Sequence, residues 1–254
     1  MIALAVLPLF DYTLRLADNG LILGHRLSEW IGHAPFLEEE LALGNIALDL
    51  IGEARAVYAY AGIVEGAGRN EDALAYLRDT YEFRNVLLVE QPNGDFAVTV
   101  VRQLLYAAFV YPFWRELSAS KDATLAAIAA KAEKEAAYHL RHSAEWLIRL
   151  GDGTAESHRR AQTALEQLWP YTGELFEVDP IEESLISEGV AADPRTLRSE
   201  WDRTLDDCFA QATLDRPTGR WMQSGGRRGR HTEHLGHLLA TMQFLQRAYP
   251  GATW

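Results

Sequence analysis

One long predicted helix, residues 121–150, carries side chains that could do chemistry on the stripe that should be buried. His139 lies on that stripe, whose apolar positions recur every three or four residues, and Glu135 and His142 border it. Polar groups buried in this way need partners, because an unpaired one is costly away from water. Carboxylates and imidazoles are also the ligands of dinuclear metal centres in helix bundles. The stretch therefore indicates such a centre, or what is left of one.

The ligand spacing does not complete a dinuclear site. Such a site needs a Glu from each of two helices and a Glu-x-x-His pair from each of two others. Glu135 is followed three residues later by a tyrosine, and His139 is preceded three residues earlier by an alanine. Asp49 has a glycine three residues later, and Arg102 stands where the third helix would have to supply a carboxylate. We expect Arg102 to point inward and to pair with Asp49 or Glu135, so that these residues form a vestigial metal-site core without metal.

These side chains must be positioned by helices, because helical periodicity is the pattern that recurs along the chain. Asp18 and Glu29 border the first helical stripe, and we expect both to be half-exposed. No stretch alternates over the length of a strand, and no repeat is evident. The sequence predicts an all-α fold, a ferritin-like four-helix bundle with additional C-terminal helices, formed as a single domain over residues 1–254. The expected helices span residues 11–32, 37–61, 72–79, 96–117, 121–150, 156–176 with a bend at Pro170, 181–188, 193–212 and 231–249.

Composition excludes several classes of function. The formal net charge of −12 argues against nucleic acid or an anionic membrane as the main partner, since both favour a basic surface. Cys208 is the single cysteine, so the chain has no internal disulfide and no Cys-x-x-Cys motif. Residues 1–10 are apolar but lack a basic leader and are about half as long as a membrane span. We expect a cytoplasmic protein.

Two further clusters of side chains each have two interpretations. His231, His234 and His237 could form a metal site, or they could cap the last helix and hydrogen-bond at its surface. The loop 219–229 before them holds several arginines and could bind a phosphate or simply be solvated. Nucleophilic catalysis and a phosphate loop have no motif to support them.

Six blocks of sequence resemble a known family. The chain is similar, nearly end to end, to the C subunits of bacterial ring 1,2-phenylacetyl-CoA epoxidases, multicomponent monooxygenases of aerobic phenylacetate breakdown. The resemblance implies that a related A subunit holds the di-iron centre and performs the epoxidation. This chain would then be a ferritin-like paralogue without a cofactor that scaffolds the A subunit. The matching blocks are Tyr12–Leu16, Glu29–Pro35, Leu87–Gly94, Tyr138–Arg141, Asp193–Arg198 and His231–Gly236.

The resemblance also implies partners and contacts. It implies a hetero-oligomer with the catalytic A subunit and with further small and reductase subunits. It places the acyl-CoA on the catalytic subunit, near the contact with this chain. An aromatic ring can stack on adenine, and an arginine beside it can pair with phosphate. This chemistry favours the first of two matching segments as a contact with the acyl-CoA. The segments are Glu82, Phe83, Arg84 and Asn85, and Glu183, Ser184 and Leu185.

Two other functions are weighed against the scaffold. The first is a metal-dependent oxygenase or oxidase with its own site around Glu135 and His139, with Asp49 and His25 as candidate further ligands. The second is a metal-free CoA-binding module that acts alone and uses Arg84 and Arg228. Retained metal would indicate the first, and tight acyl-CoA binding without a partner would indicate the second.

Overall fold

The secondary structure is helical throughout the part of the chain that is described. The computed structural model describes residues 8–252, so the first seven residues of the apolar N-terminal stretch lie outside it. No strand occurs between residues 8 and 252, and the all-α prediction is confirmed. The helices are α1 (Pro8–Ser28), α2 (Leu37–Glu65), α3 (Glu71–Tyr76), α4 (Leu87–Glu90), α5 (Phe96–Leu117), α6 (Ala123–Gly151), α7 (Ala155–Leu168), α8 (Pro180–Glu188), α9 (Arg198–Ala212), α10 (Glu233–Met242) and α11 (Phe244–Ala248).

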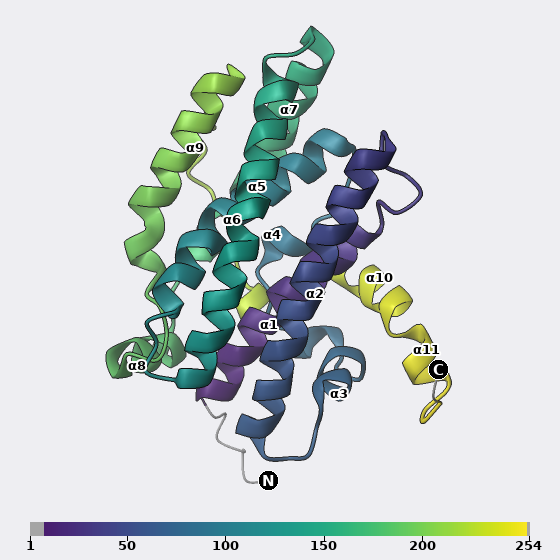
Figure 1. The fold of residues 1–254 in the computed structure, drawn as a ribbon, viewed down its shortest axis with the longest axis vertical. Helices are drawn as coiled ribbons and strands as arrows, with labels where there is room; N and C mark the ends of the chain where they lie inside the picture. The colour runs from purple at the N-terminus through teal and green to yellow at the C-terminus, as the bar shows by residue number, and fades with distance from the viewer. Residues whose placement is uncertain (1–7, 253–254) are drawn as a thin grey trace.

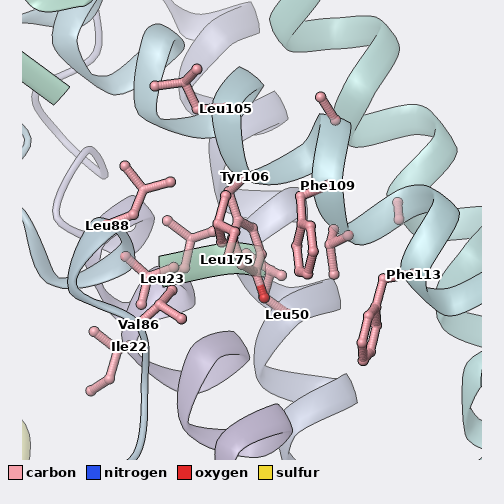
Figure 2. Packing of buried hydrophobic residues seen from close by; sticks show 14 of the residues in the cluster. Ile22, Leu23, Leu50, Val86, Leu88, Leu105, Tyr106, Phe109, Phe113 and Leu175 are labelled. Atoms are coloured by element: carbon pink, nitrogen blue, oxygen red, sulfur yellow. The ribbon is translucent and has the colours of Figure 1, made fainter. Parts of the chain in front are cut away.

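Four long helices form the bundle that the sequence predicted. Helix α1 packs along α2, α5 packs along α6, and α2 also contacts α6, which joins the two pairs (Figure 1). The shorter helices surround this bundle, with α7 and α9 beside α5 and α6. The core lies where side chains of α1, α2 and α5 meet those of the segments after α3 and α7 (Figure 2). The ferritin-like bundle with additional C-terminal helices is confirmed.

Helix α5 is the central element of the core. Between residues 8 and 252 it is the one helix long and apolar enough to cross a membrane by length and composition, yet 83% of its most apolar window is buried in the bundle. An all-round apolar helix is typical of such a position. The predicted range 96–117 is confirmed, and the helix continues through Pro112. Asp95 caps its start by accepting a hydrogen bond from Val98 N at 3.0 Å.

The ends of the other helices follow their caps. Asp122 accepts hydrogen bonds from the amides of Thr124 and Leu125 at 3.0 Å, so α6 starts at Ala123, two residues after the predicted start. Helix α2 starts at residue 37 as predicted but runs four residues further, to Glu65. It ends where Gly66 adopts a left-handed conformation with φ of 69°.

Three predicted helices are interrupted. The single bent helix expected over 156–176 is wrong, because α7 ends at Leu168 and 3-10 turns follow around Pro170. The range 193–212 begins with a 3-10 turn, Pro194–Leu197, before α9. The range 231–249 is divided at Gln243, whose side chain donates to the carbonyls of Ala75 and Arg78 at 3.1 and 3.0 Å.

Helix α1 carries charged groups into the interior. The prediction that Asp18 is half-exposed is wrong, because its relative exposure is 0%. Its carboxylate accepts hydrogen bonds from the Tyr58 hydroxyl, from the Arg78 guanidinium and, at 2.6 Å, from Arg84 N. Glu29 is exposed, as the position at the stripe edge suggested. The difference arises because Arg78 lies 60 residues further along the chain, beyond the reach of helix periodicity.

Removing the Asp18 carboxylate should destabilise the whole fold. In Asp18→Ala, the buried Arg78 guanidinium loses its counter-charge, and we expect a loss of about 3–5 kcal/mol in the free energy of unfolding. Urea titration followed by circular dichroism measures it. Asp122→Ala serves as the control, because it removes a helix cap worth about 1 kcal/mol. Equal losses in the two variants would contradict the central role of the buried pair.

Candidate functional site

The predicted chemistry-bearing residues of α2 and α6 do face each other. His139 Nε2 lies 3.0 Å from Asp49 Oδ2, and His142 Nε2 lies 2.9 Å from Glu39 Oε2. Both histidines are on α6 and both carboxylates are on α2, so each imidazole has one carboxylate partner across the helix pair. We call the whole group the α2–α6 polar cluster. It comprises Glu39, Asp49, Glu53, Glu135, His139 and His142.

Burial sets the protonation states within this cluster. Burial raises the pKa of Glu53 to about 8, and the charges of Glu135 and Asp49 contribute to this rise. Burial also lowers the pKa of His139, against the opposing influence of Asp49 and Glu135. At neutral pH the cluster therefore holds a neutral Glu53 carboxyl and a neutral His139 imidazole. Glu135 lies at its edge and pairs with Lys131 at 3.3 Å.

These residues do not fit a dinuclear metal centre. Among residues 8–252, no three or more His, Cys, Asp or Glu side chains are grouped so that they could hold a metal ion. The position on α1 that points into the bundle is Asp18, and Arg78 already neutralises it. Asp49 and His139 are each other's hydrogen-bond partners. The arrangement can hold protons and join two helices, and it offers no shared coordination sphere.

Arg102 is inward, as predicted, but its predicted partners are wrong. Its guanidinium donates to the carbonyl of Gln91 and, at 2.6 Å, to Asn93 Oδ1, and it contacts neither Asp49 nor Glu135. Burial, with a contribution from the charge of Arg26, lowers the pKa of Arg102 to about 9. Arg102 thus fixes the turn between α4 and α5 and does not belong to the α2–α6 polar cluster. Two acceptors in a turn bind the terminal nitrogens of Arg102 while its Nε has no partner, and sequence spacing does not reveal such acceptors.

The first predicted acyl-CoA segment is partly internal. Phe83 is fully buried, and its ring centroid lies 4.3 Å from the Arg78 guanidinium carbon, so it cannot stack on a ligand. Asn85 is also fully buried and donates to Glu90 Oε2 at 2.8 Å. Glu82 and Arg84 are half-buried and reach the surface. The exposed aromatic beside them is Tyr81, at 68% relative exposure.

The second segment lies on α8 and shows the same division. Leu185 is buried at 4% exposure, whereas Glu183 and Ser184 are exposed. The Glu183 carboxylate pairs with Arg195 at 3.0 Å. Leu185 therefore anchors α8, and the two polar residues present its outer face.

A chain of buried charges connects the two segments. Arg84 reaches Asp11 at 3.3 Å, and Asp11 accepts a hydrogen bond from Arg15 Nε at 2.6 Å. Arg15 then reaches Glu182 of α8 at 3.2 Å, and Glu182 also pairs with Arg227 at 2.8 Å. Sequence reasoning missed this network, although the four-residue spacing of Asp11 and Arg15 on one helix was a readable signal. The network holds both segments on one scaffold.

The segment 81–90 is also held from the C-terminal side. The buried Glu90 carboxylate accepts hydrogen bonds from Thr232 N at 2.6 Å and Thr232 Oγ1 at 2.8 Å, and contacts His231 Nδ1 at 2.7 Å. His231 Nε2 lies 3.0 Å from the Phe83 carbonyl. Burial alone would lower the pKa of His231, because it disfavours the charged imidazole. The hydrogen bond and the charge of Glu90 outweigh burial, so the pKa of His231 is raised.

Glycine is required where the C-terminal loop packs on this segment. A Cβ on Gly226 would lie 2.1 Å from the Asn85 carbonyl oxygen, and one on Gly229 would lie 2.2 Å from that of Tyr81. The buried Glu174 carboxylate accepts hydrogen bonds from the backbone amides of Leu87 and Gly225, each at 2.8 Å. The loop 225–229 is thus closely fixed to residues 81–87.

The predicted histidine and arginine clusters are divided by this packing. His231 uses both ring nitrogens internally, whereas His234 and His237 lie on α10, which starts after it. Arg227 is committed to Glu182, while Arg228 and Arg230 are exposed. Gly229 lies between Arg228 and Arg230 and packs on the Tyr81 carbonyl. The exposed Arg228 and Arg230 are therefore the basic residues of this loop that lie near Tyr81.

Comparison with known proteins gives a consistent result along the whole chain. The family described as phenylacetic acid catabolic protein matches residues 1–254. The chain is 52% identical over 243 residues to the C subunit of the 1,2-phenylacetyl-CoA epoxidase of Escherichia coli (strain K12). The aligned region covers 96% of this chain and 98% of that relative.

The buried carboxyl of Glu53 predicts a pH-dependent stability. Because its pKa is raised from 4.5 to about 8, the native protein keeps a proton that the unfolded chain has released within that window. The contribution of Glu53 is fully favourable below pH 4.5 and is lost as the pH rises through 8. Glu53→Gln, which stays neutral, should match the wild type at low pH. At pH 9 it should be more stable than the wild type by up to about 5 kcal/mol.

Chemical unfolding of both proteins from pH 5 to pH 9 measures this difference. Glu166→Gln, at an exposed position of α7, is the control and should leave a constant difference across the range. A Glu53→Gln variant whose stability stays parallel to that of the wild type would show that Glu53 is ionised in the native protein.

Proposed function

This chain belongs to the phenylacetic acid catabolic protein family, and from this premise we propose that it is the C subunit of a 1,2-phenylacetyl-CoA epoxidase. In this proposal it is a non-catalytic helical subunit of a cytoplasmic hetero-oligomer. The catalytic A subunit holds the di-iron centre and epoxidises phenylacetyl-CoA in aerobic phenylacetate catabolism. Small and reductase subunits complete the assembly. The 52% identity to the Escherichia coli subunit, over nearly the full length of both chains, carries the proposal.

The contacts inside the bundle support a structural role. In the α2–α6 polar cluster, Asp49 satisfies His139 and Glu39 satisfies His142, so these side chains hold two helices together. Arg102, on the third long helix, holds a turn. The alternative, an oxygenase or oxidase with its own site around Glu135 and His139, would need these same groups free to bind metal. Both the pairing and the named relative favour the structural role.

The proposal includes a contact with the acyl-CoA at the edge of this chain. Glu82 and Arg84, with Glu183 and Ser184 of α8, are the outward members of the two segments, and Phe83, Asn85 and Leu185 position them from inside. The exposed Arg228 and Arg230 add positive charge near Arg84, and phosphate groups favour such charge. Recognition of the nucleotide end of CoA, rather than of the acyl group, suits this chemistry.

Metal analysis and co-purification test the subunit assignment together. The chain expressed alone in iron-supplied cells should carry close to zero transition metal per chain by elemental analysis. Expressed with its A subunit, it should co-purify as a complex that contains iron. Close to two metals per isolated chain, lost in His139→Ala, would overturn the proposal in favour of the oxygenase alternative.

Substitution at Arg84 tests the acyl-CoA contact. In the assembled epoxidase, Arg84→Gln removes one charge-assisted contact and should raise KM for phenylacetyl-CoA by about tenfold while kcat stays unchanged. Arg159→Gln, exposed on α7, is the matched control and should leave both constants unchanged. The isolated chain should bind acyl-CoA only weakly, and tight binding without a partner would favour the module that acts alone.

A further inference from the structure

Most of the outward face of α2 is apolar, and its exposed polar members are Asn45 and Arg55. Leu37, Leu41, Leu48 and Ile63 are 59–77% exposed, although leucine and isoleucine are among the residues most often buried. Between them, small residues continue the same three- and four-residue spacing. We call this face the α2 stripe. Its members are Leu37, Leu41, Gly44, Leu48, Gly52, Ala56, Ala59 and Ile63.

Two glycines in this stripe are not required by the fold. A Cβ on Gly44 or on Gly52 would meet nothing within 4 Å, and neither residue has a positive φ. Each weakens the helix by about 1 kcal/mol relative to alanine. On α1, by contrast, a Cβ on Gly20 would lie 3.0 Å from the Leu50 carbonyl, and one on Gly24 would lie 2.9 Å from Ile51. Helix α1 thus carries glycines where α2 approaches it closely, and the α2 stripe carries two glycines on its open side.

The α2 stripe is long enough to seat one partner helix. From Leu37 to Ile63 the helix extends ~39 Å, given a rise of 1.5 Å per residue. A helix is ~10 Å wide with its side chains, so this face covers ~400 Å², about half of the usual area per partner in a specific complex. Figure 1 shows α2 on the near side of the molecule with no other helix in front of it.

The charges around the α2 stripe favour a different protein over a second copy of this chain. Its borders carry Glu38, Glu40 and Asp49, and Arg55, which lies within the stripe, is paired with Glu71 at 3.3 Å. A second copy would bring the three carboxylates against their own kind, in a chain of net charge −12. A partner helix with an apolar, closely approaching face and basic side chains at its edges is complementary to this surface.

We propose that the α2 stripe is the surface on which a helix of the catalytic A subunit docks, with its backbone lying over Gly44 and Gly52. The proposal rests on the proposed function and adds to it the place and chemistry of the contact. Leu41 and Leu48 enter the spaces between side chains of the partner helix. The glycines let the two backbones approach, as Gly20 and Gly24 do between α1 and α2.

Gly52→Leu tests the surface without loosening the fold. In the free chain this substitution removes a glycine from a helix and fills open space, so the melting temperature should stay the same or rise. In the complex the new side chain blocks the close approach, and the dissociation constant for the A subunit should rise at least 100-fold by biolayer interferometry. Leu48→Glu should have an effect of the same size.

Gly236→Leu is the matched control. Gly236 lies inside α10, where a Cβ also meets nothing within 4 Å, and its substitution should leave the affinity for the A subunit unchanged. Equal affinities for wild type, Gly52→Leu and Leu48→Glu would overturn the docking surface while leaving the subunit assignment intact. A wild-type chain that does not bind the A subunit would refute the proposed function itself.

Light scattering on the isolated chain tests whether a second copy of the chain binds the α2 stripe instead. The chain should be monomeric at micromolar concentration. A dimer that Gly52→Leu dissociates, with binding to the A subunit unaffected, would overturn the proposal and assign the α2 stripe to a second copy.

Discussion

A carboxylate buried in a helix bundle needs a positive charge or several hydrogen-bond donors, and the way this chain meets that need determines much of its structure. Asp18, at the centre of α1, is neutralised by Arg78, which reaches it from the connection after α3. The pair is almost completely buried, so removing either member would leave an isolated charge in the core. Arg78 can occupy this place only if residues 77–85 fold against α1. The irregular connection is therefore as fixed as the helices.

The same requirement explains why the additional helices stay on the bundle. Glu90 binds His231 and Thr232 and so fixes the start of α10 against α4. Glu174 accepts hydrogen bonds from the backbone amides of Leu87 and Gly225 and so fixes the C-terminal loop. Each contact joins segments more than 50 residues apart in the chain, and each is internal. These buried carboxylates serve as cross-links between segments, which suits a protein that supports a catalytic partner.

Periodicity predicted the parts of this fold that depend on local sequence. The ranges of α5 and α6 follow from continuous apolar stripes and from the caps Asp95 and Asp122, which the sequence displays directly. Periodicity also placed His139 on the buried face of α6, but it did not predict that His139 pairs with Asp49. The partners of Asp18 and Arg102 could not be predicted from periodicity. Arg78 lies 60 residues from Asp18, and the acceptors of Arg102 are turn groups, Gln91 O and Asn93 Oδ1. In the irregular segment 80–85, no period distinguished the buried Phe83 from the exposed aromatic two residues before it.

The two faces of α2 give the helix its role in the proposed complex. Its inner face carries Glu53 and pairs with α6, and its outer face is the α2 stripe. Asp49 lies between them, with 35% of its side chain exposed while it binds His139. A helix docked on Leu48 and Gly52 would cover the open side of Asp49 and remove water from the Asp49–His139 pair. Because hydrogen bonds between charged and polar groups strengthen when water is excluded, assembly would also tighten the contact between α2 and α6. The bundle would in this way gain rigidity from its partner.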